Sequence, residues 1–122
     1  MSDASFDTVF TQLWEVIESR KACVVSDGED CSVHSSYTVQ LLSSHPDRLL
    51  KKVAEEAAEV ILAAKDCEGA DMMQVPPVTE HGSTHEHLVY ETCDLLYHLG
   101  VLCARYDITL DELAGELKRR FV

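Results

Sequence analysis

The sequence predicts an all-α fold, a helical bundle of about four to five helices in a single domain that covers residues 1–122. Two long stretches with helical periodicity, one from Lys51 to Asp66 and one from about Glu86 to Tyr106, carry most of this prediction. No stretch alternates in the way typical of a strand, and no repeat or second domain is evident. A chain of 122 residues can bury about two-thirds of its unfolded surface, enough for one core and more safely so with a partner chain.

The first helix is expected from Asp3 to Arg20, with Asp3 or Ser5 available as the N-cap. Apolar side chains recur there at helical spacing, namely Phe6, Val9, Phe10, Leu13, Trp14 and Ile17. This face is typical of a core or a dimer contact rather than of ligand stacking. The following residues, 21–35, are expected to form a loop.

Hydroxyl-bearing residues precede the central helix. Ser36, Tyr37 and Thr38 lead into a short apolar run that predicts a short helix or turn. Their hydroxyls could cap that helix or hold phosphate oxygens. The run His45-Pro46-Asp47 then favours the start of the next helix, because proline suits a first turn and an acidic side chain suits a helix N-terminus.

The helix from Lys51 to Asp66 has an apolar and an acidic side. The apolar stripe predicts the core-facing side and consists of Leu50, Val53, Ala57, Val60, Ile61 and Ala64. On the other side, Glu55, Glu56 and Glu59 are three or four residues apart, so their carboxylates crowd one patch. A solvated acidic surface is the plain interpretation, but Leu62 lies on the same side, so the patch is not simply a strip that faces water.

The second stretch is apolar almost all round, which is typical of a buried helix, yet Glu91, Asp94 and His98 follow one line along it. A buried carboxylate without compensation costs several kcal/mol. Facing the acidic patch of the first helix, this line supplies too much negative charge for pairing with Lys or Arg alone. The two helices therefore predict one or two divalent cations with four or five oxygen ligands, drawn from Glu55, Glu56, Glu59, Glu91 and Asp94.

The connection between these helices, residues 67–85, contains glycines and two adjacent prolines that exclude one continuous helix. Such a long connection can also serve as a lid. It brings several candidate ligands near one another in sequence, namely Glu80, His81, His85 and, just beyond, His87. A His-rich metal site is conceivable, but the irregular spacing favours a plain loop.

The last helix is expected from Leu110 to Arg120. Thr109 is followed three residues later by Glu112, which is the pattern of a capping box. The basic end Lys118-Arg119-Arg120 suits the helix dipole, and it could alternatively anchor a substrate phosphate.

The composition limits the partners and the compartment. A net charge of −12 argues against nucleic acid and fits a small anionic substrate only if metal ions supply positive charge. No run reaches the ~20 apolar residues of a membrane span, and the N-terminus lacks a signal-peptide pattern. The 5 cysteines form no CxxC pair and are expected to be reduced thiols rather than zinc ligands. We therefore expect a cytoplasmic protein that binds neither nucleic acid nor membranes.

Three segments together resemble a known family. The strings SYT at 36–38, KKVAEEAAEVILAAKD at 51–66 and YETCDLLYHLGVL at 90–102 occur in the order typical of phosphoribosyl-ATP pyrophosphatases, within the all-α nucleotide pyrophosphohydrolase superfamily. The paired Glu-x-x-Glu and Glu-x-x-Asp motifs indicate only the superfamily, whereas DLLYHL and SYT favour this member. The resemblance extends from the first helix to Arg120, apart from the connection 67–85, which is longer than usual.

The resemblance implies Mg²⁺-dependent hydrolysis of phosphoribosyl-ATP to phosphoribosyl-AMP and pyrophosphate at the α–β phosphoanhydride, the second step of histidine biosynthesis. It also implies a homodimer in which the acidic helices pack in a bundle at the interface. Glu55 and Glu56 are then the catalytic candidates, and the metal ligands are Glu56, Glu59, Glu91 and Asp94. The residues implied to contact substrate or to order the site are Ser36, Tyr37, Thr38, Lys51, Lys52 and His98. His98 could equally be a partner that orients Asp94.

The chain departs from the family pattern at two further positions. Gln40 stands where Lys is frequent, which weakens the case for phosphate binding after SYT, and Ala54 stands where Gly is usual, a harmless change in a helix. Two other functions stay open. One is a house-cleaning pyrophosphatase that acts on a non-standard nucleoside triphosphate by the same chemistry, and the other is a non-catalytic helical bundle that binds metal or oligomerises. A di-iron bundle would show Glu-x-x-His on two helices, and this chain has no such pair.

Overall fold

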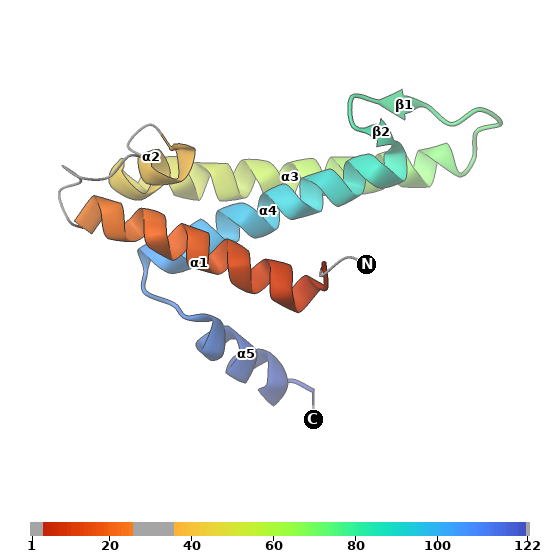
Figure 1. The fold of residues 1–122 in the computed structure, drawn as a ribbon. Helices are drawn as coiled ribbons and strands as arrows, with labels where there is room; N and C mark the ends of the chain where they lie inside the picture. Colours follow the sequence, from red (N-terminus) through yellow and green to blue (C-terminus); the bar gives the residue numbers. More distant parts are fainter. Residues whose placement is uncertain (1–3, 26–35, 122) are drawn as a thin grey trace. The chain divides into compact units, whose positions relative to one another are not determined.

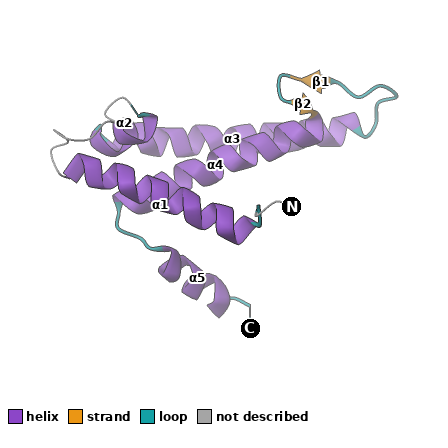
Figure 2. Ribbon diagram, in the orientation of Figure 1, coloured by secondary structure: helices purple, strands orange, loops and turns teal. Residues whose placement is uncertain are grey.

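The computed structural model describes residues 4–25 and 36–121 of the chain. It confirms the all-α prediction: the described residues form five helices and one hairpin of two very short strands (Figures 1 and 2). In order, these are α1 (Phe6–Val25), α2 (Tyr37–Ser43), α3 (Pro46–Ala70), β1 (Val78–Thr79), β2 (Gly82–Ser83), α4 (Thr84–Arg105) and α5 (Leu110–Arg119). Among the described residues, no helix is long and apolar enough to cross a membrane.

The chain divides into two compact units. The first consists of Met1–Arg48 together with Gly100–Val122, and the second is Leu49–Leu99. The first unit therefore contains α1, α2, α5 and the C-terminal end of α4. The second contains most of α3, the hairpin and most of α4, and with them every predicted cation ligand.

In the first unit, α1 buries Trp14 and Ile17. The end of α4 comes close to it at Gly100, where an added Cβ would lie 3.0 Å from Cδ1 of Ile17. Nη1 of Arg105 donates hydrogen bonds to the carbonyl oxygens of Leu41 and Leu42 at 2.9 and 3.1 Å, and so satisfies carbonyls near the C-terminus of α2.

The predicted end of the first helix is wrong, because α1 continues to Val25 rather than ending at Arg20. Residues 21–25 contain no glycine or proline that would stop a helix. Lys21, on this added turn, forms an ion pair with Asp107. The rest of the predicted loop lies outside the described residues.

The helix ends of the first unit follow the sequence signals. Asp107 adopts a left-handed φ of 60°. The amides of Ile108 and Asp107 donate to the carbonyls of Cys103 and Ala104, which is the Schellman pattern that closes α4. The capping box predicted at the start of α5 is confirmed: the hydroxyl of Thr109 accepts from the amide of Glu112, and the Glu112 carboxylate accepts from the amide of Thr109.

In the second unit, the buried seam of α3 differs from the predicted one. The residues of α3 that are buried follow every seventh position, namely Leu49, Glu56, Ala63 and Ala70. Leu50 and Ile61, from the predicted core-facing stripe, are 45% and 64% exposed in the single chain. The predicted stripe is therefore wrong at Leu50 and Ile61, whereas Val53, Ala57, Val60 and Ala64 are half-buried beside the seam.

The connection between α3 and α4 is shorter and more ordered than predicted. Helix α3 runs on to Ala70, and β1 and β2 pair as an antiparallel hairpin in which Val78 is opposite Ser83 and Thr79 opposite Gly82. No strand was expected here, because the turn lacks a typical hairpin pair such as Asn-Gly. Gly82 supplies the left-handed φ of 100° that the hairpin needs.

Helix α4 begins at Thr84 rather than Glu86 because Ser83 caps it. The hydroxyl of Ser83 accepts from the amide of Glu86 at 3.1 Å, and the Glu86 carboxylate accepts from the amide of Ser83 at 3.4 Å.

The cysteines are not all reduced thiols as expected. Cys67, Cys93 and Cys103 are free. Cys23 is disulfide-bonded, so the expectation is wrong at that position.

Candidate functional site

Helices α3 and α4 bring the predicted carboxylates together. One oxygen from each of Glu56, Glu59, Glu91 and Asp94 can be chosen so that all four lie within 4.8 Å of one another. In each helix, the two acidic residues are three positions apart, which places both side chains on one face. We call these four residues the carboxylate cluster.

Two members of the carboxylate cluster are deeply buried. Glu56 is 2% exposed and Glu91 is 6% exposed. Within the described part of the chain, Oε2 of each has no hydrogen-bond partner. An ionised carboxylate in this position is costly unless a positive charge compensates it. The arrangement therefore favours a bound cation, as the sequence predicts.

Lys52 supplies part of that positive charge. Its Nζ lies 3.0 Å from Oε1 of Glu56 and 3.5 Å from Oε2 of Glu55. Lys51 Nζ lies 3.9 Å from Oε1 of Glu55. Glu55 thus belongs with the lysines on the flank of the site and not with the carboxylate cluster. Of the two predicted catalytic residues, the structure brings only Glu56 into the cluster.

The carboxylates of the cluster differ in how readily they bind a proton. Hydrogen bonds with Glu56 and Glu91, assisted by burial and by the charges of both, raise the pKa of Glu59 to about 7. Burial, and then the contact with Glu56, raises the pKa of Asp94. Burial also acts to raise the pKa of Glu56, but its contacts with Lys52, Asp94 and Glu59 outweigh burial and lower that pKa. Without a cation, the carboxylate cluster therefore holds a proton near neutral pH, mainly at Glu59.

His98 stands beside Asp94. It is 2% exposed, and its Nδ1 donates to the backbone oxygen of Asp94 at 2.8 Å and lies 3.3 Å from Oδ1 of the same residue. Glu56, Asp94 and His98 also offer ligand atoms within 4.8 Å of one another. These contacts agree with the interpretation of His98 as a residue that orients Asp94.

The remaining predicted residues lie in the first unit. Ser36 is the N-cap of α2, and its hydroxyl accepts from the amide of Val39 at 3.5 Å. Thr38 is buried and Tyr37 is partly exposed. Two residues after the SYT segment, Oε1 of Gln40 accepts from Arg48 at 3.2 Å.

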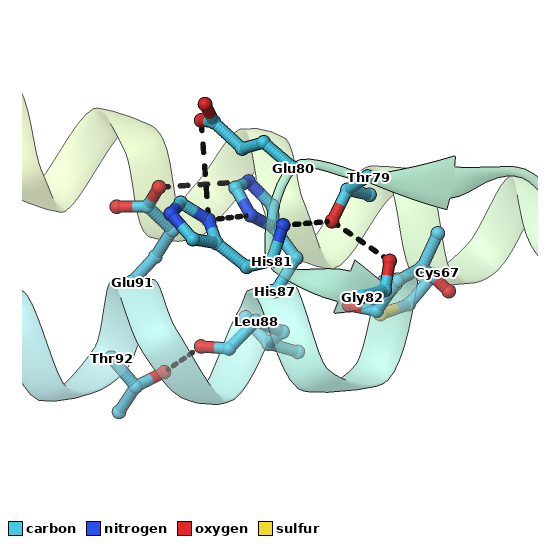
Figure 3. Close-up of polar contacts among 10 residues, drawn as sticks. Cys67, Thr79, Glu80, His81, Gly82, His87, Leu88, Glu91 and Thr92 are labelled. Atoms are coloured by element: carbon cyan, nitrogen blue, oxygen red, sulfur yellow. Dashed lines mark hydrogen bonds and ion pairs between the residues drawn. The ribbon is translucent and has the colours of Figure 1, made fainter.

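A second group of possible ligands, which the sequence did not predict as a set, lies beside Glu91 (Figure 3). His81 from the hairpin and His87 from α4 offer ligand atoms within 4.8 Å of each other and of Glu91. His85 is exposed and is not part of this group. The spacing of His87 and Glu91, four residues apart on one helix, could have indicated these two of the three ligands. His81 joins only because the hairpin folds back.

These features define an all-α protein whose two long helices hold a compact cluster of carboxylates, a site suited to a divalent cation. The family model for phosphoribosyl-ATP pyrophosphohydrolase matches residues 24–121. The chain belongs to this family, which consists of hydrolases that act on phosphoric anhydrides.

Individual relatives agree with the family match. A phosphoribosyl-ATP pyrophosphatase of Trichlorobacter lovleyi is 42% identical over 93% of this chain and 82% of its own length. Proteins of the same name from Geobacter metallireducens and Nitrosomonas eutropha are 37% and 36% identical, over 94% and 95% of this chain and 84% and 79% of their own lengths.

Proposed function

We propose that this chain hydrolyses phosphoribosyl-ATP to phosphoribosyl-AMP and pyrophosphate, the second step of histidine biosynthesis, in a reaction that requires Mg²⁺. The carboxylate cluster carries the proposal: four carboxylates converge within 4.8 Å, and two of them are buried. The substrate is supported by the family and by the printed names of the relatives.

The donor set fits Mg²⁺. The carboxylate cluster offers only oxygen atoms, which hard divalent cations prefer, and Oε2 of both Glu56 and Glu91 is buried without a hydrogen-bond partner in the described part of the chain. Glu56, Glu59, Glu91 and Asp94 would hold the ion. When bound, Mg²⁺ supplies positive charge that neutralises phosphate oxygens and promotes the attack of water on phosphorus.

The glutamates of α3 have different roles in the proposed reaction. Contact with Lys52 keeps Glu56 ionised as a ligand. Contacts with Glu56 and Glu91 raise the pKa of Glu59 to about 7 in the metal-free chain, so Glu59 would become a ligand only as the ion displaces its proton. Glu55, predicted with Glu56 as catalytic, orients Lys51 and Lys52 through its ion pairs.

The substrate carries several negative charges, and the lysines at the flank of the cluster are suited to bind them. Lys51 is largely exposed and points its ammonium group toward solvent-accessible Glu55. We assign contacts with phosphate oxygens to Lys51 and Lys52, whereas a substrate role of the SYT segment 36–38, which belongs to the other unit, stays a prediction from the resemblance. His98 acts by orienting Asp94.

We further propose that residues 1–122 act as one domain, as a cytoplasmic homodimer. The exposed apolar residues of the second unit support self-association, because Ile61 and Leu62 are each 64% exposed in the single chain. Removal of such side chains from water favours association. An Ile61→Asp variant should shift the mass measured by light scattering toward that of a single chain.

The test is release of pyrophosphate from phosphoribosyl-ATP and from a panel of standard and modified nucleoside triphosphates, with and without Mg²⁺. We expect release from phosphoribosyl-ATP alone, lost on chelation and in Glu56→Gln, and kept in the control Glu68→Gln, which changes an exposed carboxylate of the same helix. Activity on a triphosphate instead would identify a house-cleaning enzyme. A protein that binds Mg²⁺ but hydrolyses nothing would refute the proposed activity and favour a non-catalytic bundle.

A further inference from the structure

We propose that His81, His87 and Glu91 form a second cation site, which binds a transition-metal ion of the Zn²⁺ type. This inference goes beyond the proposed function, because it adds two histidine ligands to Glu91 and concerns a different metal class. Two imidazoles with one carboxylate suit zinc and its neighbours in the first transition row. Mg²⁺, in contrast, prefers oxygen ligands. We call this group the histidine site.

One ligand atom from each of His81, His87 and Glu91 can be chosen so that the three atoms lie within 4.8 Å of one another. Nδ1 of His81 lies 2.7 Å from Nδ1 of His87, and Nε2 of His87 lies 3.5 Å from Oε1 of Glu91 (Figure 3). Zinc binds imidazole nitrogen at 2.0–2.1 Å, so two ligands of a tetrahedral ion lie about 3.3 Å apart. The two observed separations end on different nitrogens of His87, Nδ1 and Nε2, and the ring can give only one of them to the same ion. A rotation of the His87 ring that directs one of its nitrogens between Nδ1 of His81 and Oε1 of Glu91 would therefore bring three ligand atoms to one ion.

The two carboxylate oxygens of Glu91 can serve different sites, one the histidine site and the other the carboxylate cluster. Its side chain is 8% exposed, and Oε1 faces His87. Oε2 is buried and has no hydrogen-bond partner in the part of the chain that the structure describes. A carboxylate in this position can join the histidine site and the carboxylate cluster. Oε2 already supports the cation of the carboxylate cluster, so the oxygen that the histidine site would use is Oε1.

The hairpin holds His81 in place. The backbone amide of His81 donates to the hydroxyl of Thr79 at 3.1 Å, and that hydroxyl donates to the carbonyl of Gly82 at 2.9 Å. The imidazole of His81 stacks on the ring of Tyr90, with centroids 3.7 Å apart and planes inclined by 13°. These contacts fix both the backbone and the ring, as a preorganised ligand requires.

The two other ligands come from one helical face. His87 and Glu91 are four residues apart on α4, so their side chains lie on the same side of the helix. An open pocket of about 490 Å³, lined by His81, Glu86, Val89 and Tyr90, borders the histidine site. This pocket gives an ion a path from solvent to His81.

The alternative is a purely structural histidine pair, held by a hydrogen bond and by stacking of rings whose planes differ by 10°. Co²⁺ distinguishes the two possibilities, because its visible d–d absorption is intense in four-coordinate sites with nitrogen ligands and weak in octahedral oxygen sites. The experiment is a titration of the full chain with Co²⁺ in excess Mg²⁺, followed by displacement with Zn²⁺.

We expect one equivalent of Co²⁺ to give the intense spectrum and Zn²⁺ to remove it. His81→Ala and His87→Ala should each weaken Zn²⁺ binding by at least the roughly 10- to 100-fold that loss of an outer partner costs a metal site. His85→Ala, which removes an exposed histidine from the same helix, should bind Zn²⁺ like the parent protein. Circular dichroism of each variant separates loss of ligand from loss of fold, and His81→Gln provides a milder change.

Glu56→Gln separates this inference from the proposed function. The variant alters the carboxylate cluster and leaves both histidines intact, so it should keep the intense Co²⁺ spectrum even if pyrophosphate release is lost. The inference is overturned if Co²⁺ gives only the weak octahedral spectrum, if Mg²⁺ displaces it, or if both histidine variants bind it as the parent protein does.

Discussion

Binding of Mg²⁺ to the carboxylate cluster should release a proton, in an amount that depends on pH. Hydrogen bonds with Glu56 and Glu91 raise the pKa of Glu59 to about 7. A group with that pKa is about nine-tenths protonated at pH 6 and about one-tenth protonated at pH 8. A cation that takes all four carboxylates in ionised form must expel this proton. We therefore expect about 0.9 proton released per ion at pH 6 and about 0.1 at pH 8.

The assay is isothermal titration calorimetry with Mg²⁺ in buffers of different ionisation enthalpy, because the slope of the observed heat against that enthalpy gives the number of protons released. Glu59→Gln should flatten the pH dependence, since it removes the group that holds the proton. Glu68→Gln changes an exposed carboxylate on the same helix and should behave like the parent protein. Equal proton release at pH 6 and pH 8, or unchanged release in Glu59→Gln, would refute the assignment of a shared proton to this cluster.

Three further predictions concern stability. The native pKa of Glu59 is raised from 4.5 to about 7, so the stability of the metal-free protein relative to Glu59→Gln should fall as pH rises from about 4.5 to 7. Below that window the difference between the two proteins should stay constant, and urea denaturation at several pH values checks both expectations. Thr109→Ala removes the hydroxyl that accepts from the amide of Glu112 and should lower the free energy of unfolding by about 1 kcal/mol in the same assay. Gly82→Ala places a Cβ 2.9 Å from Oε2 of Glu86 at a φ of 100°, so hydrogen exchange should show a hairpin destabilised by about 1–3 kcal/mol.

The carboxylate cluster could be predicted from the sequence because the signals for it lie within short stretches of the chain. Each acidic pair is spaced by three residues on a strongly periodic helix, and a cluster of like charges on an otherwise apolar helix requires compensation. Glu55 was harder to place. It neighbours Glu56 in sequence, but the 100° step between adjacent residues turns it toward Lys51 and Lys52 instead.

The histidine site and the buried side of α3 could not be predicted in the same way. His81 reaches His87 only through the hairpin, whose turn Thr79-Glu80-His81-Gly82 lacks a strong sequence signal. Helical periodicity shows that α3 has two sides, but which side is buried depends on what packs against it. The cap at Ser83, in contrast, could have been predicted from the sequence, because Ser83-Thr84-His85-Glu86 is a capping-box pattern.

The buried positions of α3 and α4 include carboxylates that do not stabilise the packing of the helices. The requirements of the fold alone therefore do not explain why these carboxylates are there. Glu56 occupies the seam of α3 at seven-residue spacing between Leu49 and Ala63, where an aliphatic residue would stabilise the packing. On α4, Glu91 and His98 are likewise seven residues apart and both buried. Both helices thus have charged or polar side chains at buried positions where a helical core favours apolar ones, and such exceptions are typical of functional sites. Because a cation that binds only the folded chain stabilises it by mass action, the same carboxylates that weaken the metal-free core should couple its stability to the ion that they bind.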